Sequence, residues 1–237
     1  MLRKIMAKLR QRTVEPQRQY TIDGFHLDMG EGHMLSVYQK QFPMYDRFVP
    51  FLGKVADAKA DAEGVAQPVI LDVGANVGDT VAGFIRHTRA RTVCVEPTEK
   101  FISLLRKNVG NMPAEYQKRI DIVQAYVGQN AGEHYVSSVS GGTAHKELVS
   151  DIGEAPTLTV TDVLARQEIP ASGCVLIKTD TDGYDSECLL SAGGGTRARI
   201  PHTLLGKSAR WRRTGGEIPH NDGLLVGTWV SALLRFR

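Results

Sequence analysis

Four short apolar runs, separated by segments with helical spacing, constrain the fold of this chain more than any other feature. The runs are VILDVG at 69–74, RTVCVEP at 91–97, IDIVQAYVG at 120–128 and CVLIKTD at 174–180. Continuous apolar runs of this length are typical of parallel strands buried on both faces. Helical spacing is seen at 79–88, 98–111, 159–167 and 184–192. The order predicts an α/β fold with a mostly parallel sheet and helices on both faces.

Length and composition set the outer limits of the interpretation. The 237 residues suffice for one large domain with its own core, and 42% hydrophobic with 23% charged residues is typical of globular proteins. No apolar run has the length of a membrane span, and the N-terminus lacks a hydrophobic secretory segment. Cys94, Cys174 and Cys188 are too few and too far apart for a disulfide framework or a zinc site. We therefore expect a cytoplasmic protein.

Changes in residue composition divide the chain into three parts. Residues 1–60 are expected to form lead-in helices and short strands, with a helix through Tyr45–Leu52, and 61–192 to form the ligand-binding core. A polar connector is predicted at 57–68, with the sequence DAKADAEGVAQP. Residues 193–237 form a basic tail rich in Gly and Arg.

Charge is uneven along the chain and bears on its partners. The tail carries eight Lys and Arg against two Asp and Glu, whereas residues 1–192 carry 21 against 24. An acidic body argues against a nucleic-acid backbone as substrate. Residues 2–9 have the pattern of a short basic amphipathic helix, which allows weak contact with a membrane surface but is more often packed on its own domain.

The turn after the first apolar run, GANVGDT at 74–80, indicates a ligand site, because ligands of such sheets bind beyond the carboxyl ends of the strands. A dinucleotide fingerprint needs glycine at the first, third and sixth positions, where this chain has Gly74, Asn76 and Asp79. A phosphate-binding loop would need Gly-Lys-Ser/Thr, which is missing. An acid at the sixth position would face a pyrophosphate, so we expect a ligand without phosphates.

S-adenosylmethionine meets these requirements, because it has no phosphates and carries a sulfonium cation. Gly74 and Gly78 are expected to let the backbone approach it, Asp72 to meet its amino group, and Asn76 to hold the turn or the carboxylate. Glu96 lies 18 residues after Gly78, near the spacing of an acid that binds ribose hydroxyls. The predicted cofactor-binding residues are Asp72, Gly74, Asn76, Gly78, Glu96, Gln124 and Ala125.

Together these motifs resemble the FkbM-type family of S-adenosylmethionine-dependent methyltransferases. The segments that carry the resemblance are LDVGANVGDT at 71–80, VEPTEKFISLLRKNV at 95–109, TLTVTDVL at 157–164 and LIKTDTDGYDSECL at 176–189. The lead-in SVYQKQFPMYDRFVPFLG is similar too, so the resemblance spans residues 20–192. It implies a class I (Rossmann-like) methyltransferase that transfers a methyl group to a hydroxyl of a sugar, a glycan or a secondary metabolite.

The motif KTDTDGYD at 178–185 supplies the predicted catalytic residues. Lys178, Asp180 and Asp182 share one face of an extended strand. Asp180 or Asp182 is expected to accept the proton of the acceptor hydroxyl, and Lys178 to orient a carboxylate or contact an acidic acceptor. The alternative is a purely structural pair of Asp180 and Lys178. We expect no metal, because a divalent ion on the two aspartates lacks a third ligand.

Two further alternatives stay open at this point. The polar insert 129–156 lies where an acceptor lid is expected, with His145 and Lys146 as candidates, although exposed polar residues explain it as well. The function itself has two rivals: a cofactor-binding remnant with impaired catalysis, and a nucleic-acid methyltransferase that uses the basic ends.

The tail departs from the resemblance after Ala192. Its Gly/Arg/Trp-rich text, with no strand-like run before about Leu224, is what a G+C-rich gene gives when read out of frame. A divergent natural tail or an RNA-binding extension is the alternative. If the tail supplies no strands, the C-terminal part of the sheet is incomplete and the fourth strand becomes an exposed edge.

Overall fold

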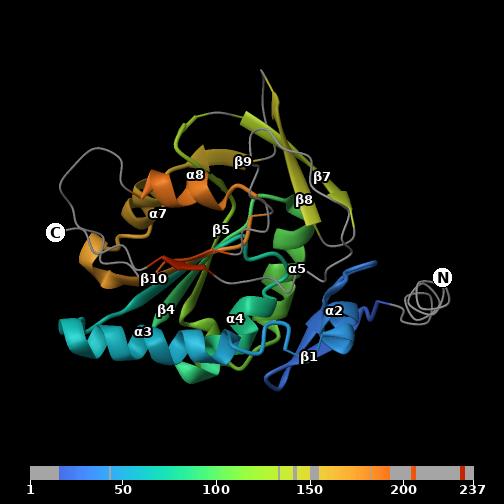
Figure 1. Cartoon of the computed structure of the whole chain (residues 1–237), viewed down its shortest axis with the longest axis horizontal. Coiled ribbons are helices and arrows are strands. Elements are labelled where there is room, and N and C mark those ends of the chain that lie inside the picture. Colours follow the sequence, from blue (N-terminus) through green and yellow to red (C-terminus); the bar gives the residue numbers. More distant parts are fainter. Residues whose placement is uncertain are drawn as a thin grey trace, which may run out of the picture.

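The structure is a computed structural model of the whole chain (Figure 1). It describes residues 16–42, 44–132, 134–140, 143–149, 155–181, 183–192, 204–206 and 230–232. The amphipathic segment predicted at 2–9 lies outside these residues, as does most of the tail.

The predicted parallel sheet is confirmed. Its parallel strands are β3 (Val69–Val73), β4 (Arg91–Val95), β5 (Ile120–Val123) and β10 (Cys174–Thr179), in the spatial order β10-β3-β4-β5. The helices that follow them are α4 (Asp79–Phe84, continued by the 3-10 turn η1, Ile85–His87), α5 (Glu99–Gly110), α6 (Ala114–Gln117) and α8 (Asp185–Ser191). All five residues of β3 and all six of β10 are buried, as their continuous apolar sequences require.

Helices cover both faces of the sheet (Figure 1). Side chains alternate along β3, so that Ile70 packs in the core on the face of α3 (Val49–Glu63) and α4, whereas Leu71 packs in the core on the face of α7 (Val160–Arg166) and α8. Thr159 caps α7 by a reciprocal capping box with Asp162, and the 3-10 turn η2 (Ala171–Gly173) leads into β10. Two apolar cores therefore fix the sheet from both sides.

The lead-in region packs against the first of these cores. It consists of β1 (Gln19–Ile22), β2 (Phe25–Asp28) and α2 (Leu35–Gln41). The strands are joined by Asp23 and Gly24, both with positive φ, which is the two-residue turn that matches strand twist. Phe25 and Leu27 are buried in the same cluster as Ile70, so the hairpin shares the core of the sheet.

The connector predicted at 57–68 is wrong over most of its length. Helix α3 continues through Glu63 and ends where Gly64 takes a left-handed conformation. Alanine has the highest helix propensity, and Ala56 and Ala60 are fully buried one turn apart. The second half of the helix was missed because its buried residues there, Ala56 and Ala60, are small and give a weak hydrophobic pattern. Its start was also misplaced: the helix expected at Tyr45–Leu52 begins at Val49.

The third apolar run and the polar insert form a second small sheet beside the first. The run 120–128 breaks after β5, and β6 (Tyr126–Val127) pairs with β9 (Ala155–Leu158). The insert contains the antiparallel hairpin of β7 (His134–Ser140) and β8 (Thr143–Val149), and β7 also pairs with β9. The lid candidates His145 and Lys146 belong to β8, and their side chains lie outside what the structure describes.

The expectation that β10 would be an exposed edge is wrong over the described part of the tail. The strand β11 (Leu204–Gly206) pairs in parallel with Ile177–Thr179 of β10, and β12 (Val230–Ala232) pairs antiparallel with β11. Two short strands of the tail thus extend the sheet, because β10 offers unpaired backbone groups that another strand can satisfy. The reading-frame hypothesis stays a prediction about the gene.

Candidate functional site

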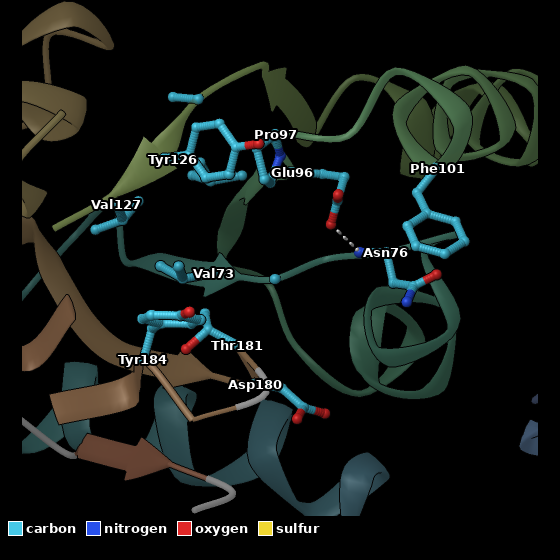
Figure 2. Close-up of a pocket in the computed structure, with 13 residues that line it drawn as sticks. Val73, Asn76, Glu96, Pro97, Phe101, Tyr126, Val127, Asp180, Thr181 and Tyr184 are labelled. Carbon is cyan, nitrogen blue, oxygen red and sulfur yellow. Dashed lines mark hydrogen bonds between the residues drawn. The ribbon is translucent and has the colours of Figure 1, made fainter. Parts of the chain in front are cut away.

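A cleft of about 610 Å³ opens at the carboxyl ends of β3, β4 and β10, where the sheet topology predicts a ligand site. Figure 2 shows Glu96, Pro97 and Tyr126 on one side and Asp180, Thr181 and Tyr184 on the other. The lining residues are Val73, Gly74, Asn76, Val95, Glu96, Pro97, Phe101, Ala125, Tyr126, Val127, Asp180, Thr181 and Tyr184. The predicted residues Gly74, Asn76, Glu96, Ala125 and Asp180 therefore meet in one cleft.

Glu96 is held by backbone donors at the end of β4. Its Oε2 accepts a hydrogen bond from the Asn76 amide at 3.0 Å, and its Oε1 accepts one from the Thr98 amide at 3.0 Å. Only 4% of Glu96 is exposed, and this burial raises the pKa of its carboxyl despite the two backbone donors. Each oxygen keeps a second lone pair, so the fixed carboxylate has acceptor capacity for a pair of hydroxyls.

The glycines of the turn answer structural demands. Gly74 has φ +75°, and a Cβ there would overlap the backbone carbonyl oxygen of Asp180. Gly78 has φ +88°, and its Cβ would lie 2.7 Å from the Leu105 side chain. Gly78 begins α4 and does not line the cleft. At both positions the missing side chain makes room for other parts of the protein, the Asp180 carbonyl and the Leu105 side chain.

Asp72 and Lys178 form a buried ion pair beneath the turn. They lie opposite each other on β3 and β10, and both are at most 1% exposed. Lys178 Nζ lies 2.8 Å from Asp72 Oδ1 and donates to the Gly74 carbonyl at 3.3 Å. Burial alone would lower the pKa of Lys178, but the Asp72 carboxylate beside it raises the pKa above its usual value. Neither residue lines the cleft, so the pair that Lys178 forms with Asp72 lies behind the cleft wall.

The remaining predicted residues occupy different places. Gln124 stands beside the cleft, where its Nε2 donates to Glu99 Oε2 at 3.0 Å and to the Pro97 carbonyl at 3.4 Å. Asp180 follows β10 on the cleft wall, and its amide donates to the Val73 carbonyl at 3.0 Å. Asp182, the other candidate base, lies outside the described residues.

Sequence reasoning missed the aromatic walls of the cleft. Phe101 on α5 is buried and lines the cleft. Tyr126 and Tyr184 line it as well, and Thr181 donates to the buried Asp185 through its amide and its hydroxyl, both at 3.0 Å. The available signals were Tyr126, near the end of the third apolar run, and Tyr184, in the DGYD motif.

The lining fits S-adenosylmethionine. Its aromatic and aliphatic walls suit a purine ring. Among the described lining residues, Glu96 and Asp180 are acidic and none is Lys, Arg or His. A cleft with this charge suits a sulfonium and a neutral nucleoside and disfavours phosphates.

Comparison with known families identifies the chain. The model of the methyltransferase FkbM domain matches residues 72–212, which is more than half of the chain. The chain therefore belongs to the FkbM methyltransferase family, and its cofactor is S-adenosylmethionine. The match continues past Ala192, so the resemblance does not stop there as expected. A comparison with curated proteins gave no significant match.

Two solved structures to which this chain is similar are named as methyltransferases. An O-methyltransferase from Bacillus cereus, solved in complex with SAH, is 17% identical over 66% of this chain and 56% of its own, with a TM-score of 0.35. A precorrin-6y C5,15-methyltransferase from Geobacter metallireducens GS-15 is 12% identical over 63% and 59%, with a TM-score of 0.34. This chain thus matches little more than half the length of either protein.

Membrane-spanning helices and metal sites are both absent from the described residues. None of their helices is both long enough and apolar enough to cross a membrane. The same part of the chain contains no group of three or more His, Cys, Asp or Glu side chains placed to hold a metal ion.

Replacing Lys178 with methionine should destabilise the fold by roughly 3–5 kcal/mol, because it leaves the Asp72 carboxylate buried without its partner. The double variant Asp72→Asn/Lys178→Met removes both charges and should be more stable than Lys178→Met alone. Urea unfolding of the parent, the single variants Asp72→Asn and Lys178→Met, and the double variant measures this. Losses that simply add in the double variant would show that the two charges are not coupled.

Replacing Glu96 with glutamine should weaken binding of S-adenosylhomocysteine about tenfold or more, because a charged acceptor of two hydroxyls is lost. Calorimetric titration measures the affinity. Glu115→Gln is the matched control: Glu115 is exposed on α6 and outside the cleft, and its substitution should leave the affinity nearly unchanged. Parental affinity in both Glu96→Gln and Glu96→Ala would remove Glu96 from the cofactor site.

The pH dependence of binding gives a second readout of Glu96. Since burial raises the pKa of its carboxyl, protonation begins at a higher pH than for an exposed glutamate. Protonation removes the charged acceptor, so affinity for S-adenosylhomocysteine should fall as pH decreases through this raised pKa. The Glu96→Gln protein should lack this part of the pH profile.

Proposed function

We propose that this chain is an O-methyltransferase whose acceptor is a hydroxyl of a sugar, a glycan or a secondary metabolite. The observation that carries the proposal is the position of Asp180. This residue belongs to the wall of the cofactor cleft, on the side opposite Glu96 (Figure 2). A sugar hydroxyl is a poor nucleophile at neutral pH, and a carboxylate at this position is a suitable general base.

The residues of the chain have separate roles in this proposal. S-adenosylmethionine, when bound, supplies a methyl group on a sulfonium. Glu96 accepts the ribose hydroxyls, and the aromatic walls exclude water and hold the adenine. Asp180 accepts the acceptor's proton and orients its oxygen for in-line attack.

In this proposal the Asp72–Lys178 pair positions the turn at Gly74 and the end of β10 relative to each other. Lys178 holds the Gly74 carbonyl, and the Gly74 turn is packed against the Asp180 carbonyl. The pair therefore fixes the distance between the turn that carries the cofactor and the strand that carries the base. Lys178 is a positioning residue in this account, because its ammonium is buried and directed at Asp72.

Replacing Asp180 with asparagine should lower turnover by roughly 10²-fold or more while the affinity for S-adenosylhomocysteine stays nearly the same. The amide keeps the size and polarity of the side chain but cannot accept the proton. Transfer of a labelled methyl group to a panel of nucleotide sugars and cell-envelope glycans measures turnover and identifies the acceptor.

Glu115→Gln on the exposed helix α6 is the control for loss of a single surface charge and should have parental turnover. Unchanged turnover in Asp180→Asn would move the base elsewhere, with Asp182→Asn the next variant to test. Binding of S-adenosylhomocysteine by the parent without transfer to any acceptor would support a cofactor-binding module and contradict the proposal.

A further inference from the structure

An asparagine lies in the buried face of α5, where the other side chains are apolar. Asn108 is 1% exposed, and the other buried residues of this helix are Phe101, Ile102, Leu105 and Val109. Asparagine is a poor helix former, and a buried amide costs free energy unless its hydrogen bonds are made. An apolar residue would serve packing better at this position, so the hydrogen bonds of Asn108 indicate what the residue does.

The Asn108 side chain joins the lead-in region to the cofactor turn, residues 74–78. Its Oδ1 accepts a hydrogen bond from the Asp28 amide at 2.8 Å. Its Nδ2 donates to the Asp28 carbonyl at 3.0 Å and to the Val77 carbonyl at 2.8 Å. One donor and two acceptors around the side chain fix which atom is the oxygen and which the nitrogen. A single buried amide thus connects β2 with the turn between β3 and α4.

The cofactor turn needs support from outside, because its backbone has an uncommon conformation. Three of its five residues have positive φ, and one of them, Asn76, carries a side chain. The first half of the turn is held by two of its amides, which donate to the Val95 carbonyl at 3.0 and 3.1 Å. In the second half, the Val77 carbonyl is held by Asn108.

The residue between these two supports belongs to the cofactor cleft. Asn76 lines the cleft, and its amide donates to Glu96 Oε2 at 3.0 Å. Val77 follows directly, so a displaced Val77 carbonyl would turn the backbone that presents this amide. The direction of the Glu96 carboxylate thus depends on Asn108, which does not itself line the cleft.

We propose that Asn108 is a positioning residue for S-adenosylmethionine, and that through it the lead-in region takes part in cofactor binding. The inference rests on the proposed role of Glu96 and does not depend on the acceptor. Asn108 holds the Val77 carbonyl and so keeps the turn in the shape that fixes Glu96. Asp28 holds Asn108 in its turn, and is itself paired with Lys107, whose Nζ lies 2.7 Å from Asp28 Oδ2.

Calorimetric titration of the full chain with S-adenosylhomocysteine tests the proposal. Asn108→Ser and Asn108→Asp both remove the amide donor, and each should weaken binding about tenfold or more, because the Val77 carbonyl is released. Lys107→Met is the matched control. It removes another contact between α5 and Asp28 but leaves the bond to Val77, so the affinity should stay within about twofold of the parent's. Circular dichroism checks that each protein is folded at the titration temperature.

A double-mutant cycle with Glu96→Gln separates positioning from a general loss of structure. If Asn108 acts through Glu96, Asn108→Ser should weaken binding much less in the Glu96→Gln protein than in the parent. Parental affinity in Glu96→Gln alone would overturn the role of Glu96 and this proposal together. A loss in Glu96→Gln to which the Asn108→Ser loss simply adds would overturn the proposal for Asn108 alone.

A measurement on the parent protein covers the case in which the Asn108 variants do not fold. In protein made with isotope-labelled asparagine, the side-chain amide protons of Asn108 should exchange slowly with solvent. Their NMR resonances should shift when S-adenosylhomocysteine is added, because they hold the turn that the cofactor contacts. Resonances unchanged at saturation, parental affinity in both Asn108 variants, or an equal loss in Lys107→Met would overturn the proposal.

Discussion

The arrangement of the site depends on one buried interaction, the ion pair of Asp72 and Lys178. Their strands are neighbours in the sheet, and each residue is the last charged side chain before its strand ends at the cleft. Two charges without access to water must stay together, since either one alone carries a large desolvation penalty. The pair therefore locks the ends of β3 and β10 at one register, and Lys178 extends this lock to the Gly74 carbonyl.

The rest of the site follows from that register. Gly74 has no side chain where the Asp180 carbonyl approaches. Two residues further on, the backbone amide of Asn76 donates to the Glu96 carboxylate at the end of β4. Glu96, the turn and the proposed base are thus connected through backbone contacts at the ends of three adjacent strands.

Local sequence was sufficient for some of these features and insufficient for others. Buried parallel strands were predictable because each is a continuous apolar run, and Glu96 because strand order places its strand end beside the first turn. The partner of Lys178 was not predictable, because it lies more than a hundred residues earlier and depends on strand register. The second half of α3 was missed because Ala56 and Ala60 give little hydrophobic contrast.

We propose that one cleft, between Glu96 and Asp180, brings the cofactor and the base together. A crystal structure of the full chain in complex with S-adenosylhomocysteine tests this claim most directly. The account predicts ribose hydroxyls within hydrogen-bond distance of the Glu96 carboxylate and a sulfur that faces the Asp180 side of the cleft. A nucleoside bound elsewhere, or a sulfur directed away from Asp180, would contradict it.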